Sequence, residues 1–258
     1  MGPRLSFGYA SDTGQVRENN EDSLLSFYAD VMNENNRPMF GVFVVADGMG
    51  GHQNGEKASA IATETIMDTV LRDVYLRLFA TGADQAVQPP VLETLEDAIT
   101  NANKQIITEV PEAGTTVTAV VIMGNLAYFG HVGDSRAYLV REGEIEQITD
   151  DHTFVNRLVE IGTMTKEEAE KSDQGHRIYR ALGLGETMEV DTMTRRFRTG
   201  TLVLCSDGLS GMVDDDAICE VVKSTEDPQR TADMLVELAN QNGGHDNVSV
   251  IVVTMVGD

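Results

Sequence analysis

The amino-acid sequence predicts an α+β fold in which stacked antiparallel sheets are covered by helices. Short runs rich in Val, Ile, Tyr and Phe recur along the 258 residues and indicate strands. Between 115 and 149 only tight turns separate such runs, which indicates an antiparallel meander. Longer segments with helical periodicity alternate with the strand groups. This order of elements is typical of packed sheets flanked by helices.

The individual elements follow in chain order. Strands are predicted at 5–10, 23–28, 39–46, 115–123, 126–132, 136–140, 201–206 and 248–255. The turns of the meander are expected at Gly124-Asn125, Gly133-Asp134 and Glu142-Gly143. Apolar residues at helical spacing predict helices over 55–79, 91–109 and 225–240, the last with Pro228 in its first turn. The segment 80–90, with Gly82, Pro89 and Pro90, is predicted to be a loop.

The segment at about 150–185 differs in texture from the strand groups around it. It contains short, charged helical pieces, and Thr165 is placed to cap one of them with Glu168 three residues later. We therefore expect a flap subdomain here. The length of the chain suits one hydrophobic core, so a single domain over 1–258 is predicted.

Composition excludes several classes of partner. The formal charge of -23 repels phosphate backbones and anionic lipids, so neither nucleic acid nor a membrane surface is expected as a partner. No apolar run approaches the ~20 residues of a membrane span, and the first residues lack the pattern of a signal peptide. Cys205 and Cys219 lie in apolar surroundings and are expected to be reduced. These features predict a cytoplasmic protein, which we expect to be a monomer.

One device recurs where predicted strands end: an aspartate with glycine beside or near it. Asp47 follows the run VFVVA, Asp134 follows LAYFGHVG, Asp207 follows TLVLCS, and Asp246 precedes the last strand. A single Asp-Gly pair is most often a turn residue. Four such ends on neighbouring strands would bring carboxylates together, and two of them ~4 Å apart would repel by ~4 kcal/mol at an effective dielectric near 20. Such crowding favours a bound cation, and hard oxygen donors suit Mg²⁺, Mn²⁺ or Ca²⁺.

The segment VRENNEDS near the N-terminus combines Arg17 with the adjacent acids Glu21 and Asp22. Read alone, it is a surface charge cluster. Beside a metal centre its chemistry changes, because the planar guanidinium of arginine binds a phosphate through two hydrogen bonds and paired carboxylates hold metal ions or their waters. The combination then suits a phosphate ester next to a metal.

Eight motifs, taken in order, resemble those of the metal-dependent protein phosphatases of the PP2C (PPM) type, and in particular the stand-alone bacterial serine/threonine phosphatases. They are VRENNEDS, VVADGMGG, GTTVTAVVI, HVGDSRAYL, DHTFVNRLVEIG, RALG, LCSDGLSGMV and GGHDNVSVIVV, and they span about 7–256. The resemblance implies a four-layer αββα sandwich with a two-metal site at its mouth. It implies hydrolysis of phosphoserine and phosphothreonine in proteins, commonly in opposition to a bacterial serine/threonine kinase.

The resemblance also implies a role for each acid. Asp47 is similar to the carboxylate that bridges two Mn²⁺ or Mg²⁺ ions, with Asp207 and Asp246 as ligands of the first ion. Glu21 and the Gly48 carbonyl correspond to ligands of the second, and Asp22 to the residue that holds metal-bound water. Asp134 is similar to a ligand of a third, weaker ion that shares Asp207. Arg17 is expected to bind the substrate phosphate.

Two stretches depart from the family pattern. Many eukaryotic members carry a histidine, proposed as the leaving-group acid, where this chain has Met49, and a thioether cannot donate a proton. A metal-bound water or His52 is left for that role. The flap reads SDQGHRIYRALG, with Ser172-Asp173 and His176 in place of a His-Pro pair and an asparagine. The remaining histidines, His131, His152 and His245, are interpreted as hydrogen-bonded structural residues.

Two other functions compete with the phosphatase hypothesis. A catalytically silent PP2C-fold protein would bind partners without hydrolysis, but every metal and phosphate position is present. A phosphate-binding NTPase is suggested by GMGGHQNGEKAS, but Gly55 is followed by Glu56-Lys57-Ala58 and not by Gly-Lys-Ser/Thr. Within the family, activity on phosphotyrosine or a small phosphoester stays open.

Overall fold

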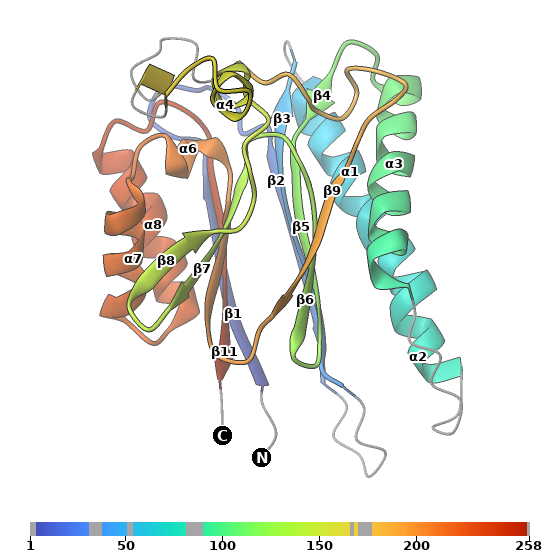
Figure 1. Cartoon of the computed structure of the whole chain (residues 1–258), viewed down its shortest axis with the longest axis vertical. Coiled ribbons are helices and arrows are strands. Elements are labelled where there is room, and N and C mark those ends of the chain that lie inside the picture. Colours follow the sequence, from blue (N-terminus) through green and yellow to red (C-terminus); the bar gives the residue numbers. More distant parts are fainter. Residues whose placement is uncertain are drawn as a thin grey trace.

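The chain folds into two stacked antiparallel sheets with helices on both outer faces (Figure 1). The computed structural model describes residues 4–30, 38–50, 54–80, 90–165, 168–169 and 177–256. The first sheet has the strand order β1-β11-β10-β7-β8. Its strands are β1 (Arg4–Asp12), β7 (Arg136–Arg141), β8 (Glu144–Gln147), β10 (Gly200–Cys205) and β11 (Val248–Val256).

The second sheet has the order β2-β3-β5-β6-β9, with the short strand β4 paired to the end of β3. Its strands are β2 (Asp22–Ala29), β3 (Phe40–Met49), β4 (Gly114–Thr115), β5 (Val117–Met123), β6 (Leu126–Val132) and β9 (Asp191–Arg196). Tight turns join β5 to β6 and β7 to β8, as predicted. The prediction of one continuous meander is wrong at Gly133-Asp134, because the chain passes there from the second sheet to the first and β6 does not pair with β7. The antiparallel pairing of β2 with β3 places Asp22 opposite Asp47.

Helices cover the outer face of each sheet. On the second sheet lie α1 (Asn54–Val70), the π-helical turn η1 (Leu71–Tyr75), α2 (Leu76–Ala80) and α3 (Val91–Glu109). On the first lie α7 (Asp215–Ser224) and α8 (Pro228–Gln241), preceded by the short α6 (Asp207–Ser210). Helix α4 (Phe154–Glu160) sits at one end of the sandwich, above the edges of the sheets (Figure 1). The αββα architecture is therefore confirmed.

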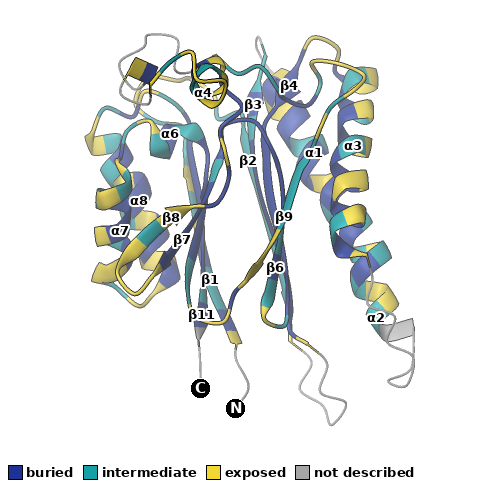
Figure 2. Ribbon diagram, viewed as in Figure 1, coloured by how far each residue is buried: buried dark blue, intermediate teal, exposed yellow. Residues whose placement is uncertain are grey.

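Three apolar layers hold the sandwich together (Figure 2). Strand β3 shows why its sequence is a continuous apolar run: Val42 and Val44 pack against α1 and α3, whereas Phe43 and Val45 point into the layer between the sheets. Successive side chains of a strand face opposite sides, so a strand covered on both faces needs apolar residues at every position. The third layer packs α7 and α8 on the first sheet.

Helix boundaries agree with the sequence at most points. Helix α3 has the predicted limits, and α8 begins at Pro228 behind the cap Asp227, whose side chain accepts from the Gln229 N–H at 3.0 Å. The predicted single helix over 55–79 is interrupted by the π-helical turn. The expected cap near 165 is present, because Thr165 and Glu168 bond each other's backbone N–H.

Besides the single-turn helix α6, two described elements of the structure have no counterpart among the predicted ones. Strand β9 has the sequence DTMTRR, and its exposed edge position lets it lack the apolar alternation that marks other strands. Helix α7 is short, but its cap is visible in hindsight: Asp214 accepts from the Ala217 N–H at 2.8 Å. Most of the predicted loop at 80–90 lies outside the described residues, as do His52, Ser172-Asp173 and His176.

Candidate metal centre

Asp47 and Gly48 stand at the end of β3, where three segments of the chain meet. The Asp47 N–H donates to Thr116 Oγ1 at 3.0 Å, and the Asp47 carbonyl accepts from Thr116 N–H and Thr115 Oγ1, both at 2.9 Å. A Cβ on Gly48 would lie 2.4 Å from the Glu21 carbonyl oxygen. Only glycine fits there, so the backbone of Gly48 approaches Glu21 as the motif requires.

The acids of VRENNEDS face this strand end. The Glu21 carboxylate lies over the first turn of α1, with its Cδ 2.8 Å from the point where a Cβ on Gly55 would stand. Burial raises the pKa of Glu21, against the lowering effect of Arg17. Asp22 accepts a hydrogen bond from Ser206 Oγ at 2.8 Å through Oδ2, while its buried Oδ1 has no hydrogen-bond partner. Burial raises the pKa of Asp22 to about 7.

The carboxylates of Asp47, Asp134 and Asp207 interact electrostatically within the site. Burial, then the charges of Asp22 and Asp207, raise the pKa of Asp47 well above its usual range, and Asp134 adds to the effect. Asp134 is 5% exposed, and its Oδ1 is buried without a hydrogen-bond partner. Burial and the charge of Asp207 raise the pKa of Asp134 to about 8. Strand ends far apart in the sequence thus bring like charges together.

Asp246 and Arg17 make an ion pair at the exposed rim of the site. Arg17 Nη2 lies 2.6 Å from Asp246 Oδ2, and the two side chains are 53% and 37% exposed. The hydrogen bond to Asp246 raises the pKa of the Arg17 guanidinium, which stays charged. Arg17, the predicted phosphate-binding residue, therefore contacts the predicted metal ligand Asp246 and is accessible to solvent.

Sequence reasoning missed the residues that hold these acids in place. The Asn247 side chain accepts from the Glu21 N–H at 2.8 Å and donates to the carbonyls of Thr13 and Asn19, so it ties the N-terminal loop to β11. Ser206 bonds Asp22 and also accepts from the Ser249 N–H at 3.0 Å. The sequence signal that could have identified them is a small polar residue directly beside a predicted metal ligand, as in Ser206-Asp207 and Asp246-Asn247.

The donor set fits a hard divalent cation. Carboxylate oxygens surround the mouth, and one oxygen of Asp22 and one of Asp134 are buried without a hydrogen bond, which costs free energy unless a cation or proton meets them. Among the residues that the structure describes, no three acidic, histidine or cysteine side chains already form a closed ligand set.

The residues proposed for other roles also have definite places. The Met49 side chain packs against Gly114, with Cγ 3.3 Å from the position of a Cβ there, and offers no acidic proton. His131 and His152 are buried and hydrogen-bonded, as predicted, whereas His245 is exposed, and its structural role stays a prediction. Cys205 and Cys219 are free, buried thiols, as expected.

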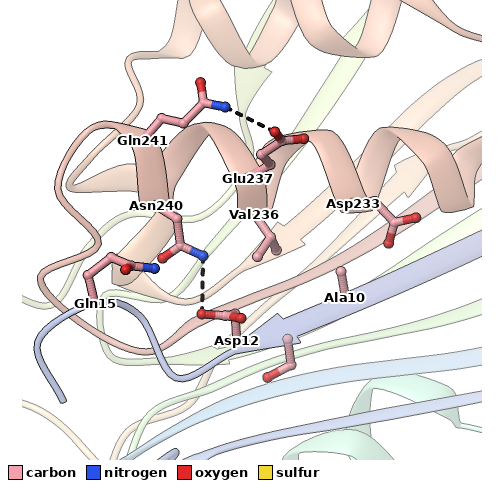
Figure 3. A pocket seen from close by; sticks show the side chains of 9 residues that line it. Ala10, Asp12, Gln15, Asp233, Val236, Glu237, Asn240 and Gln241 are labelled. Atoms are coloured by element: carbon pink, nitrogen blue, oxygen red, sulfur yellow. Dashed lines mark hydrogen bonds between the residues drawn. The ribbon is translucent and has the colours of Figure 1, made fainter.

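A separate cavity of about 540 Å³ lies between the end of β1 and α8 (Figure 3). Asp12, Asp233, Glu237 and Asn240 are among the residues that line it, and Asn240 Nδ2 donates to Asp12 Oδ1 at 3.1 Å. None of the predicted site residues lines this cavity. The cavity is distinct from the group of acids around Asp47, which we call the carboxylate mouth and which comprises Glu21, Asp22, Asp47, Asp134, Asp207 and Asp246.

Comparison with known proteins identifies the family. The sequence profile described as protein phosphatase 2C matches residues 15–245. The chain belongs to the protein phosphatase 2C family. It is 33% identical over 246 residues to the serine/threonine phosphatase stp of Listeria monocytogenes, a match that covers 95% of this chain and 94% of that one. It is 39% identical to the serine/threonine protein phosphatase PstP of Mycobacterium tuberculosis over 98% of this chain and 45% of that one, so it spans about half of PstP.

Solved structures agree with this assignment. A Streptococcus agalactiae serine/threonine phosphatase matches with a TM-score of 0.83 and 30% identity, over 98% of this chain and 100% of that one. The catalytic domain of PstP in complex with two manganese ions matches with a TM-score of 0.77 and 36% identity, over 98% and 99%. The family is metal-dependent, and the relatives named above are serine/threonine phosphatases. Among the described residues of this chain, no helix is long and apolar enough to cross a membrane.

Proposed function

We propose that this member of the family hydrolyses phosphoserine and phosphothreonine in proteins with two divalent cations held at the carboxylate mouth. The observation that supports it most directly is the convergence of Asp22, Asp47 and Asp134, whose pKa values are all raised by burial and by neighbouring carboxylates. Mutual repulsion of this kind opposes folding unless cations bind, and it marks a site built to hold charge.

In the proposed ligand set Asp47 would be shared by the two ions. Asp207 and Asp246 would hold the first ion, and Glu21 with the Gly48 carbonyl would hold the second. Asp22 would hold water beside them, and Asp134 with Asp207 would hold a third, weaker ion. When bound, the cations activate a water for attack on phosphorus at neutral pH and offset charge on the phosphoryl oxygens. Mn²⁺ and Mg²⁺ both suit these donors.

Arg17 is proposed to bind the substrate phosphate. Its guanidinium is half-exposed and paired with Asp246, so it can exchange that carboxylate for a phosphate that enters from solvent. Its charge would then stabilise the phosphoryl group as negative charge redistributes during transfer. Met49 supplies no proton, so water at the mouth or His52 is left to protonate the leaving alkoxide.

The proposal extends to organisation and partners. We propose a single domain over 1–258 with a flap at about 150–185, acting as a cytoplasmic monomer. Phosphorylated proteins would be its substrates, including those of a cognate serine/threonine kinase and the kinase itself. The charge of -23 disfavours nucleic acid and membrane surfaces as partners.

Hydrolysis of p-nitrophenyl phosphate and of a phosphothreonine peptide tests the proposal. We expect turnover with Mn²⁺, weaker turnover with Mg²⁺, loss on exhaustive chelation, and recovery when Mn²⁺ is restored. Turnover that survives chelation would refute the metal-dependent mechanism. Tight Mn²⁺ binding in calorimetry without turnover of either substrate would instead support the catalytically silent alternative.

A further inference from the structure

The turn that carries Asp134 depends on the residue before it. Gly133 has φ +118°, a conformation that favours glycine, and a Cβ there would lie 2.5 Å from Thr116 Cβ. On the far side of Asp134 the turn is fixed by Ser135, whose carbonyl accepts from Thr118 Oγ1 at 2.8 Å. On the near side the backbone polar groups of Gly133 need partners of their own, so a residue that bonds both of them helps to set where the Asp134 carboxylate points.

His152 bonds both of them. The His152 N–H donates to the Gly133 carbonyl at 2.7 Å, and the Gly133 N–H donates to His152 Nδ1 at 3.0 Å. Because Nδ1 accepts, the neutral ring carries its hydrogen on Nε2. The side chain is 4% exposed, so water does not compete for these bonds. The adjacent Asp151 holds Arg136, two residues beyond Asp134, through Oδ2 at 2.7 Å.

His152 also contacts the 177–180 segment, which returns from the predicted flap. Its carbonyl accepts from the Tyr179 N–H at 2.9 Å. Its Nε2 lies 3.2 Å from Asp191 Oδ2 at the start of β9, and Arg180 Nη1 donates to Asp191 Oδ1 at 2.7 Å. One imidazole thus joins the Asp134 turn through Nδ1 to the Arg180–Asp191 pair through Nε2.

The same returning segment reaches the bridging acid. Two residues beyond Arg180, Leu182 exchanges backbone hydrogen bonds with Thr115 at 2.9 and 3.1 Å, and Thr115 Oγ1 donates to the Asp47 carbonyl. The 177–180 segment, extended to Leu182, is therefore bonded to Thr115 beside Asp47 and, through His152, to the turn that carries Asp134. A displacement of this segment would be felt at both acids.

We propose that His152 is a positioning residue that sets the Asp134 carboxylate for metal binding and couples it to the 177–180 segment. The inference rests on the proposed function, because it assigns Asp134 to a metal ion. His152 does not touch substrate or metal in this role. It acts through the Gly133 N–H, and its consequence is that the metal requirement of the enzyme depends on one hydrogen bond remote from the cation.

Two substitutions separate the two sides of the ring. In His152→Asn the amide oxygen occupies the place of Nδ1 and retains an acceptor for the Gly133 N–H, while the donor toward Asp191 is lost. In His152→Gln the amide nitrogen occupies the place of Nε2 and retains the donor toward Asp191, while the acceptor at Nδ1 is lost. Both remove the imidazole, so loss of ring packing is common to the pair.

The first readout is the Mn²⁺ concentration that gives half-maximal hydrolysis of p-nitrophenyl phosphate. We expect His152→Gln to raise it by about 10-fold or more, the usual effect of losing a group that orients a metal ligand. His152→Asn should stay within about 2-fold of the unmodified protein, since the Gly133 bond persists. Equal shifts in both variants, or none in His152→Gln, would overturn the proposal.

The second readout needs no activity. Amide hydrogen exchange of Gly133 in the metal-free protein should quicken by about 5-fold in His152→Gln, the equivalent of one lost hydrogen bond, and stay unchanged in His152→Asn. Unchanged exchange in both variants would also overturn the proposal. Asp134→Asn serves as the reference. If it leaves the Mn²⁺ requirement unchanged while exchange follows expectation, the metal role proposed for Asp134 fails, whereas the role of His152 in holding the Gly133 turn stands.

Discussion

The carboxylate mouth and the pair His131–His152 both bury titratable groups, but they differ in how those groups are satisfied. The two imidazoles lie with ring centroids 4.9 Å apart and ring planes tilted by 38°, and each ring nitrogen has a polar neighbour. Burial lowers the pKa of His131 to about 3 and also lowers that of His152, so both rings are neutral. At the mouth, Asp22 and Asp134 each keep a buried oxygen without a hydrogen bond.

Whether a buried polar group has a hydrogen-bond partner within the chain distinguishes groups that stabilise the fold from groups that await a ligand. A buried polar group that has its partners contributes to a unique fold, whereas one that lacks them destabilises the protein unless a ligand arrives. The histidine pair is complete within the chain. The mouth is complete only with cations, so substitutions there should affect metal binding and metal-free stability in opposite directions.

The largest expected effect is that of Asp47→Asn. The amide retains the shape of the side chain but removes the charge proposed to bridge both cations, so we expect turnover to fall by more than the about 100-fold typical of outer metal-site partners. Calorimetry should show loss of tight Mn²⁺ binding. Because repulsion with Asp22 and Asp207 is relieved, the metal-free variant should unfold at a higher temperature.

The opposite signs make this test sharp. A variant that lost both activity and metal-free stability would indicate a folding defect. Full activity in Asp47→Asn would show that the metal centre lies elsewhere. The acids of the mouth would then be an electrostatic liability without a function.

The next effect is acid destabilisation through the histidine pair. The folded-state pKa of His131, about 3, lies below the ordinary value of 6.5, so between these values unfolded His131 binds more protons than folded His131. The contribution of His131 to stability should therefore fall as pH falls through that window, by up to about 1.4 kcal/mol per pH unit. The free energy of unfolding of His131→Gln, measured with urea at several pH values between 5 and 6.5, should change less steeply with pH than that of the unmodified protein. The exposed His245→Gln is the matched control, and its slope should equal that of the unmodified protein.

An effect of opposite sign is expected at the mouth between about pH 4 and 8. The folded-state pKa values of Asp22 and Asp134, about 7 and about 8, lie above the unfolded values, so the stability gained from their protonated forms is lost as pH rises. In the lower part of this range the unfolded histidines also bind protons and contribute with the opposite sign, and that contribution vanishes only above about pH 7.5. In chelator the loss should approach about 1.4 kcal/mol per pH unit for each carboxylate while the pH lies between its unfolded and folded pKa values, and it should end above the folded one.

Mn²⁺ should remove this loss, because cation binding favours the ionised carboxylates. The increase in melting temperature on adding Mn²⁺ is therefore expected to be larger at pH 8 than at pH 6.5. Scanning calorimetry in chelator and in Mn²⁺ at both values measures it. A pH-independent increase would mean that the bound cation does not meet these two acids.

The comparison also explains what the sequence could predict. Aspartates that follow apolar runs can be recognised because strand ends of one sheet share an edge, and the structure brings Asp47, Asp134 and Asp207 together as expected. The residues that orient them could not be found this way. Asn247 and His152 act through backbone groups distant in sequence, and no local pattern records those partners. The edge strand β9 was missed for a related reason, since its pairing with β6 and not its composition makes it a strand.

The smallest effect on folding is expected from Arg17→Ala. Its ion pair with Asp246 is half-exposed, and such pairs contribute about 1 kcal/mol or less to stability. Calorimetric Mn²⁺ affinity should be retained, since removal of Arg17 leaves every proposed ligand in place and frees Asp246. The KM for a phosphothreonine peptide should rise, and Arg17→Lys should restore part of it, because an ammonium keeps the charge but not the planar fork. Lost Mn²⁺ binding in Arg17→Ala would place this guanidinium among the groups that build the metal centre and would extend the incomplete region of the molecule to its exposed rim.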